Sequence, residues 1–344
     1  MSLPDPPRSA TPSRNRIGRF HITRELGRGT LSTVYLGHDP VIDRTVAIKA
    51  FHRDLVAQTR RMQDRQLINE ARAAGRLSHP HIVTIFEASS EGPETYIAME
   101  YLQGSALSTL LDAGHAFGYE AIATICWKLA DAIDHAHRHD VVHRDIKPAN
   151  IFLVGDHQPK LVDFGIARAP NRLGSSIVST DNPETLFCNN LLGTPNYMSP
   201  EQAGGHPVDR RTDIYSLGAV MYQMLTGRTP FQAIETDTLL QLIAAKVPES
   251  PRDLNPAIPK ALSRIVMKAM NRQEDKRYQD AGDMTRDIKR YLIDGKRTRR
   301  RQRMETIDSE RSGTGNGARN PAIQTALLAV CAALSFAIAV LLLR

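Results

Sequence analysis

The feature that most constrains the fold is a change of residue pattern near Gln103-Gly104. Before this point, runs rich in β-branched and aromatic residues predict strands at residues 20–27, 32–39, 45–50, 82–88 and 95–99, with one helix at 61–77. After it, apolar residues at helical spacing predict helices at 105–111, 119–139, 211–226, 236–246, 259–270 and 280–293, and one strand pair at 151–154 and 160–162. A β-rich segment followed by a helical one predicts an α+β protein with two lobes and a hinge near residues 100–104.

The chain has a net charge of +7, and the position of this charge in the sequence indicates which classes of partner to expect. Residues 296–303 contain six basic and no acidic residues, so the rest of the 344-residue chain carries only +1. Nucleic-acid binders more often spread positive charge over a folded face, so we expect no nucleic-acid partner. Three distant cysteines, Cys126, Cys188 and Cys331, provide neither a disulfide framework nor a metal-ligand spacing, which fits a reducing cytosol.

One polar loop, residues 143–150, concentrates chemistry that suits phosphoryl transfer. Asp145 supplies an acceptor for a hydroxyl proton, Lys147 a point cation and Asn150 a metal-binding carbonyl. A polar turn stabilised by Asp and Asn side chains is the alternative interpretation of this loop alone.

Six motifs stand in one order around this loop. They are Gly27-Arg28-Gly29 through Val34, Val46-Ala47-Ile48-Lys49, Glu70 in the predicted helix, His143 to Asn150, Asp163-Phe164-Gly165, and Ser199-Pro200-Glu201. Together they resemble the eukaryotic-like (Hanks-type) Ser/Thr protein kinases of bacteria over about residues 20–293. The resemblance implies a bilobal protein-kinase-like fold, with a five-stranded sheet and one helix in the N-lobe (residues 20–101) and a mainly helical C-lobe (residues 102–293).

The resemblance implies ATP and Mg²⁺ as cofactors, with Mn²⁺ as a further option. It places the nucleotide against residues of the N-lobe and hinge: Gly27, Arg28, Gly29, Val34, Ala47, Lys49, Glu70, Met99, Glu100 and Leu102. Lys49 would bind the α- and β-phosphates and pair with Glu70, while Met99 would be the gatekeeper beside the adenine. Ser32 departs from the family pattern, which has a third glycine there. Taken alone, Gly27 and Gly29 would favour a simple hairpin turn.

The same resemblance assigns the chemistry itself. Asp145 would orient the substrate hydroxyl or accept its proton, and Lys147 would steady the γ-phosphate. Asn150 and Asp163 would hold the metal ion. These roles make the chain a non-specific Ser/Thr protein kinase whose partners are proteins with Ser or Thr hydroxyls.

The polar segment between Gly165 and Ser199 resembles an activation loop. Its candidate phosphorylation sites are Ser175, Ser176, Ser179, Thr180 and Thr185, with Arg144 as the arginine that would pair with the phosphate. Thr194 would hydrogen-bond near Asp145 and Lys147.

Other matching residues look architectural. The resemblance implies an ion pair between Glu201 and Arg277, and it implies that Asp213 anchors the catalytic loop. Histidines at 135, 137, 139 and 143 suggest a zinc site, but alternate helical residues point about 200° apart, so we disfavour it. We expect His143 to brace the loop from the core.

The two ends of the chain carry different signals. Residues 1–19 are rich in Pro, Ser and Arg without an apolar core, which predicts a disordered leader. Residues 294–321 read as a basic juxtamembrane linker, and residues 322–343 as an uncharged transmembrane helix. The basic run before the helix predicts a single-pass protein of the inner (plasma) membrane, with a cytoplasmic kinase domain, contacts to membrane lipids and no sensor domain beyond the bilayer. A buried soluble helix and a nuclear targeting signal are the competing interpretations.

A row of small residues, Ala329, Ala333 and Ala337, raises the hypothesis of a homodimer, although alanine is equally ordinary in membrane helices.

Two alternatives to a protein kinase remain: a pseudokinase scaffold and a kinase of small molecules. The first predicts damage at Lys49, Asp145, Asn150 or Asp163, and none is damaged. The second is disfavoured by the Ser199-Pro200-Glu201 segment and its Arg277 partner, which favour a protein substrate.

Overall fold

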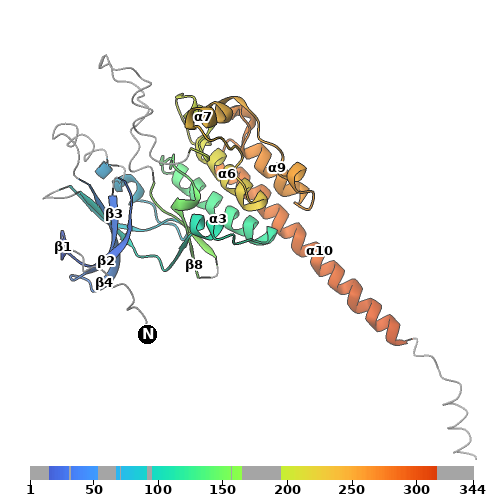
Figure 1. The fold of residues 1–344 in the computed structure, drawn as a ribbon. Helices are drawn as coiled ribbons and strands as arrows, with labels where there is room; N and C mark the ends of the chain where they lie inside the picture. The colour runs from blue at the N-terminus through green and yellow to red at the C-terminus, as the bar shows by residue number, and fades with distance from the viewer. Residues whose placement is uncertain are drawn as a thin grey trace, which may run out of the picture. The chain divides into compact units, whose positions relative to one another are not determined.

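The structure is a computed structural model. It describes residues 15–30, 32–52, 67–69, 71–90, 95–155, 157–164 and 195–315, and the side chains of these as far as residue 297, together with that of Arg303. The chain divides into two compact units, Met1–Leu292 and Ile293–Arg344. Figure 1 shows the strand-rich part of the first unit in blue beside its helical part in green to orange.

The N-lobe contains a six-stranded antiparallel sheet of order β1-β2-β3-β4-β6-β5. Its strands are β1 (Arg16–Ile17), β2 (Phe20–Arg28), β3 (Ser32–Asp39), β4 (Arg44–Phe51), β5 (Ile85–Ser89) and β6 (Tyr96–Glu100). Residues 67–69 and 71–74, within the predicted helix, are helical.

The expectation of five strands and of a disordered leader through residue 19 was wrong at one edge of this sheet. Arg16 and Ile17 pair with β2 as a sixth strand. Ile17 is 3% exposed and packs in a core with Phe20, Tyr35, Val46 and Tyr96, so burial orders a segment whose composition looked like a leader.

The C-lobe is mainly helical, as the spacing of apolar residues predicted. Its helices are α2 (Leu107–Asp112), α3 (Tyr119–His137), α5 (Pro200–Ala203), α6 (Arg211–Thr226), α7 (Thr236–Ala245), α8 (Pro251–Leu254), α9 (Lys260–Ala269) and the first part of α10 (Ala281–Gly315), with short 3-10 turns at Pro148–Asn150 and Glu274–Lys276. A second sheet joins β7 (Gly104–Ala106), β8 (Ile151–Val154) and β9 (Gln158–Leu161). The strand β7 occupies residues where a helix start was predicted, because its backbone pairs with β8.

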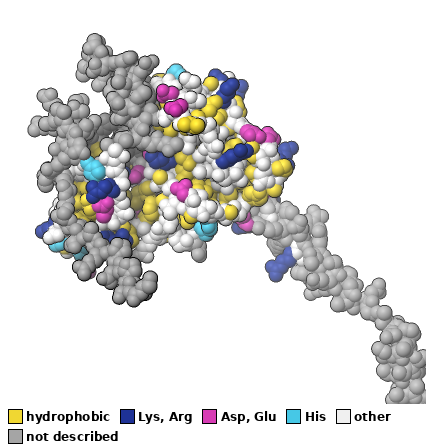
Figure 2. All heavy atoms as spheres, in the orientation of Figure 1, with side chains coloured by type: hydrophobic (Ala, Val, Ile, Leu, Met, Phe, Trp, Pro, Cys, Tyr) yellow, Lys and Arg dark blue, Asp and Glu magenta, His cyan; other side chains and the backbone are white. Residues whose placement is uncertain are grey.

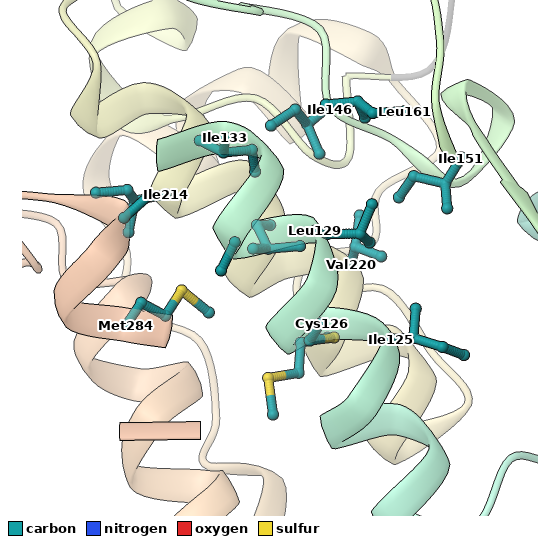
Figure 3. Close-up of a cluster of buried hydrophobic side chains, with 14 of the residues drawn as sticks. Ile125, Cys126, Leu129, Ile133, Ile146, Ile151, Leu161, Ile214, Val220 and Met284 are labelled. Atoms are coloured by element: carbon teal, nitrogen blue, oxygen red, sulfur yellow. The ribbon is translucent and has the colours of Figure 1, made fainter. Parts of the chain in front are cut away.

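The core of the C-lobe is built around α3 and α6. The stripe predicted along α3 is buried, since Ile122, Ile125, Leu129 and Ile133 are each at most 1% exposed. Figure 3 shows Ile125, Leu129 and Ile133 of α3 among residues of α6 and α10, including Ile214, Val220 and Met284. The rigid packing of α3 on α6 matters for the site, because the loop after α3 carries the candidate catalytic residues.

Much of the predicted linker, residues 294–321, is helical. Helix α10 continues to Gly315 through a stretch whose most frequent residue is Arg, a good helix former. Among the residues that the structure describes, no helix combines the length and apolar character needed to cross a membrane. The predicted spanning helix, residues 322–343, lies outside the described residues.

Candidate active site

The loop between α3 and β8 brings three of the predicted residues into contact. The Lys147 ammonium lies 2.8 Å from Oδ2 of Asp145. The amide nitrogen of Asn150 donates to the same oxygen at 3.0 Å and to the backbone carbonyl of Asp145 at 2.8 Å. Both amide hydrogens are therefore directed at Asp145, which leaves the carbonyl oxygen of Asn150 as its remaining polar atom.

Asp213 of α6 holds the backbone of this loop, as predicted. Its buried carboxylate accepts hydrogen bonds from the backbone N–H of His143 at 2.8 Å and of Arg144 at 2.7 Å. It also accepts one from Nε2 of His137 at 2.8 Å. Arg144 has a φ of 62°, a conformation that is unfavourable for a side chain with a Cβ, so these bonds stabilise a strained turn.

His143 braces the loop from the core, which confirms the expectation for this residue. It is 1% exposed, and its Nε2 lies 3.0 Å from the carbonyl oxygen of Val162. Since that carbonyl can only accept, Nε2 carries the proton and Nδ1 accepts from the backbone N–H of Asp145 at 3.2 Å. One imidazole thereby ties Asp145 to the strand that leads to Asp163.

Lys49 on β4 and Asp163 form an ion pair across the site, with 2.8 Å between the ammonium and Oδ1. Asp163 also has a positive φ, 59°, a backbone conformation that is unfavourable for a residue with a Cβ. Glu70, the predicted partner of Lys49, lies outside the described residues, so that pairing stays a prediction.

An apolar cluster contains residues of both lobes. It joins four of the predicted residues, Val34, Ala47, Met99 and Leu102, with Leu26, Val83, Tyr101, Phe152 and Val162. Sequence reasoning missed these five, although the apolar residues of the predicted strands were a usable signal. The cluster combines β2, β3, β4 and the hinge with β8, which forms an apolar lining from both lobes.

The hinge residue Glu100 uses its carboxylate to connect the lobes. Its Oε2 lies 2.7 Å from the ammonium of Lys160 on β9 and accepts from the backbone N–H of Thr84 at 3.4 Å. Because the side chain is engaged, any contact of Glu100 with a base in the site would come from its backbone.

The glycine-rich turn connects β2 and β3. The strands pair as far as Gly27 with Val34 and Arg28 with Thr33, and the Gly29 N–H donates to the carbonyl of Ser32 at 2.8 Å. Arg28 pairs with Glu25 at 2.7 Å on the exposed side of the strand. A Cβ at Gly27 would meet no atom within 4 Å, so the fold itself does not require glycine there.

The predicted ion pair between Glu201 and Arg277 is present and buried. The guanidinium donates to both carboxylate oxygens, at 2.8 and 2.7 Å. Burial opposes ionisation of Glu201, but the hydrogen bonds from Arg277 outweigh it and lower the pKa of this carboxyl below its usual value. Next to it, the side chain of Gln202 donates to the carbonyl of Arg144 at 2.9 Å, which couples this segment to the catalytic loop.

Ion pairs on the surface of the C-lobe are exposed by comparison. Arg210 pairs with Asp280 at 2.9 Å, and each side chain is 50% exposed. On the face shown in Figure 2, Lys and Arg side chains are interspersed with Asp and Glu side chains over the helical lobe.

His135 of α3 lies near two other histidines, one just after this helix and one in the segment before β5. The ring of His135 lies 4.5 Å from that of His139 and 5.2 Å from that of His79, between centroids. In the part of the chain that the structure describes, no three His, Cys, Asp or Glu residues are placed to hold a metal ion.

Several predicted residues fall outside the described ranges. They are Gly165, Ser175, Ser176, Ser179, Thr180, Thr185 and Thr194.

The chain is similar to known proteins in sequence and in structure. The family model described as "Protein kinase domain" matches residues 20–287. The serine/threonine-protein kinase PrkC of Bacillus subtilis is 37% identical over 273 residues, which cover 79% of this chain and 40% of PrkC. The serine/threonine-protein kinase PknB of Mycobacterium tuberculosis is 34% identical over 283 residues, covering 79% of this chain and 42% of PknB. The chain thus spans about two fifths of the length of these curated relatives.

Among solved structures, the kinase domain of PknI from Mycobacterium tuberculosis aligns with a TM-score of 0.62 at 23% sequence identity. The alignment covers 79% of this chain and 94% of that domain. At this identity the likeness establishes a shared fold.

Proposed function

This chain belongs to the protein kinase family, and from that premise we propose that it transfers the γ-phosphoryl group of ATP to Ser or Thr hydroxyls of proteins. The observation that carries the proposal is the contact of Lys147 and Asn150 with Asp145, together with the ion pair between Lys49 and Asp163. His143 connects the two groups, because its ring bonds the backbone of Asp145 and that of Val162, next to Asp163.

Asp145 is the residue that would orient the substrate hydroxyl and accept its proton. The ammonium of Lys147, 2.8 Å from this carboxylate, would place positive charge where the transferred phosphate becomes negative. A proton acceptor of this kind contributes about 10²–10⁴-fold to a rate.

Asn150 and Asp163 are suited to hold a divalent cation. Hard cations such as Mg²⁺ or Mn²⁺ take oxygen ligands, and the orientation of Asn150 leaves its carbonyl oxygen for that purpose. When bound, such a cation would neutralise charge on the polyphosphate. Lys49, held by Asp163 in this structure, is close enough to the same place to bind the α- and β-phosphates.

The apolar cluster supplies a place for the base of the nucleotide. Val34 and Ala47 would contact it from the N-lobe and Phe152 from the C-lobe, with Met99 at the back. The backbone of Glu100 and Leu102 would provide hydrogen bonds. Gly27, Arg28 and Gly29 would lie over the phosphates. The two glycines have no Cβ, which permits a close approach of the backbone there.

The class of substrate rests on two supports. PrkC and PknB carry the name serine/threonine-protein kinase, and the Glu201–Arg277 pair secures the segment after the activation loop, where a polypeptide would bind. Autophosphorylation of the loop between residues 165 and 194 is part of the proposal, with Thr180 and Thr185 as favoured acceptors.

The test uses the full chain with Mg-ATP, a generic protein substrate and mapping of phosphorylated residues by mass spectrometry. We expect phosphoserine and phosphothreonine with wild type, and a rate at least about 100-fold lower with Asp145→Asn. Asp140→Asn is the matched control, because it is the same substitution at an exposed aspartate outside the site. Nucleotide binding without transfer would favour a scaffold, and transfer only to small molecules would refute a protein substrate.

We also propose that residues 322–343 anchor the chain in the inner membrane, with the basic residues 296–303 near anionic lipids and the kinase domain in the cytoplasm. The alanines at 329, 333 and 337 would let two copies associate. Expression of the full chain and of a chain ending at residue 315 tests the anchor. Sedimentation of both with, or both without, the membrane fraction would contradict it.

A further inference from the structure

A histidine just beyond β4 contacts the glycine-rich turn at two points. The Nε2 atom of His52 lies 2.8 Å from the hydroxyl oxygen of Thr33, and its Nδ1 lies 3.1 Å from the carbonyl oxygen of Thr30. From this geometry we infer that His52 is a positioning residue that holds the glycine-rich turn in place for a nucleoside triphosphate.

A single neutral tautomer satisfies both contacts. The Thr30 carbonyl can only accept, so Nδ1 carries the proton and donates to it. The unprotonated Nε2 then accepts from the hydroxyl of Thr33, which is 2% exposed. The imidazole of His52 can therefore form both hydrogen bonds at once, in one tautomer and one ring orientation.

The position of His52 in the sheet explains why a side chain is needed there. The β3–β4 ladder ends at the pair Ser32 and Phe51, so His52 is the first residue beyond it. On the other side, the β2–β3 ladder ends at Arg28 and Thr33. The described part of the turn between these ladder ends is held by the Gly29–Ser32 backbone bond and by the imidazole of His52.

The strap formed by His52, Thr30 and Thr33 also fixes the turn relative to Lys49. Lys49 lies on β4 and His52 directly after it, and Lys49 is paired with Val34 in the β3–β4 ladder. The strap therefore joins the turn to the strand that carries Lys49. Ser32, which replaces the third glycine of the family pattern, lies inside the strapped turn.

The consequence for the reaction concerns binding of nucleotide. This step rests on the proposed phosphoryl transfer. A turn that is already held loses less conformational freedom when a polyphosphate binds, so the strap raises affinity. The chemical groups of Asp145 and Lys147 are not touched by it. His52→Ala should therefore raise KM for ATP about 3–10-fold, the range for the loss of a hydrogen-bonded contact, and leave kcat within about twofold.

The experiment uses the full chain and four variants: His52→Ala, His52→Gln, Thr33→Val and the double variant His52→Ala/Thr33→Val. Steady-state kinetics give KM and kcat for ATP, and a fluorescent ADP analogue with Mg²⁺ gives Kd. Amide exchange of a peptide covering residues 27–34 reports the turn without nucleotide. His21→Ala is the control, because His21 is exposed on β2 and bonds neither Thr30 nor Thr33.

We expect His52→Ala and Thr33→Val each to raise KM and Kd and to speed exchange of the turn. We expect the double variant to be no worse than His52→Ala, since both changes remove one interaction, and His52→Gln to recover part of the affinity. Unchanged exchange in His52→Ala, or fully additive effects, would overturn the strap. Failure of the wild type to transfer phosphate would refute the proposed function alone, because exchange decides the strap independently.

Discussion

The catalytic loop and the glycine-rich turn are held in opposite ways. The catalytic loop hangs from the buried carboxylate of Asp213, which binds two of its backbone N–H groups. The glycine-rich turn is exposed, and the contacts described for it are one backbone bond and the ring of His52. The catalytic loop is thus fixed by buried bonds, whereas the glycine-rich turn is held by fewer contacts and gains further order from the ligand.

The energetic basis of this difference is burial. A hydrogen bond to a charged group contributes about 1.5–3 kcal/mol in a buried site, but an exposed polar contact competes with water and contributes less. The strained backbone of Arg144 can be maintained only where such bonds are strong. We therefore expect substitutions that affect the catalytic loop to change folding and catalysis. Substitutions in the glycine-rich turn should change nucleotide affinity.

The largest combined effect, on folding and on catalysis together, is expected for Asp213→Asn. The amide keeps one acceptor oxygen but turns an NH₂ group toward a backbone or histidine donor, so the unfolding free energy should fall by about 3 kcal/mol. The catalytic rate should fall more than about tenfold, because Asp145 follows the loosened residues. Urea denaturation and kcat measure the two effects.

Asp237→Asn is the control for this substitution, since Asp237 is exposed in the first turn of α7. Similar stability losses in both variants would show that the buried carboxylate has no special role in holding the loop.

A loss of about 3–5 kcal/mol is expected for Arg277→Ala, because it leaves the buried carboxylate of Glu201 without its partner. Arg210→Ala breaks an exposed pair and should cost at most about 1 kcal/mol. Thermal unfolding of the two variants compares them. If Arg277→Ala is folded, stable and fully active, the pair does not secure the segment.

A smaller effect is expected from acid. The pKa of Glu201 is lowered in the folded chain, so its contribution to stability is present above the ordinary value of 4.5 and is lost as pH falls through the lowered folded value. The midpoint of thermal unfolding should therefore fall less steeply below about pH 4.5 in Glu201→Gln than in wild type. Parallel curves for the two proteins at acid pH would contradict this assignment.

The smallest effect on folding, within about 0.5 kcal/mol, is expected for Gly27→Ala, because a Cβ there meets nothing within 4 Å. Affinity for Mg-ADP should nevertheless fall about tenfold, since the methyl group would separate the backbone from the phosphates. Gly118→Ala, where a Cβ is equally unhindered, is the control. Unchanged affinity in Gly27→Ala would mean that the turn does not cover phosphate.

The helical lobe could be predicted closely from the sequence because its periodicity is strong. Helix α6 begins and ends at the predicted residues, and the α3 stripe is buried as expected. The sixth strand could not be predicted, because two residues carry no periodicity and Ile17 becomes buried only when the sheet exists. The same holds for β7, which is a strand only through its pairing with β8.

The candidate site likewise contains features that could be predicted from the sequence and features that could not. The motif residues of the catalytic loop and the roles of Asp213 and His143 followed from the order of motifs. The ion pair of Lys49 with Asp163 and the contacts of His52 depend on the distance between segments, which spacing in the sequence does not determine. The contacts of a histidine that follows a strand cannot be predicted from the sequence, because they depend on how that strand pairs.

Hydrogen–deuterium exchange on the full chain, with and without Mg-ADP, tests most directly whether one half of the site is fixed by the fold and the other is ordered by ligand. We predict that the amides of His143 and Arg144 exchange slowly in both conditions, because Asp213 protects them. The amides of residues 29–33 should exchange faster than those two in the free chain, where the Gly29–Ser32 bond and His52 hold the turn only in part, and should slow further with Mg-ADP. Rapid exchange at His143 and Arg144, or equal slow exchange in the glycine-rich turn with and without nucleotide, would contradict the division.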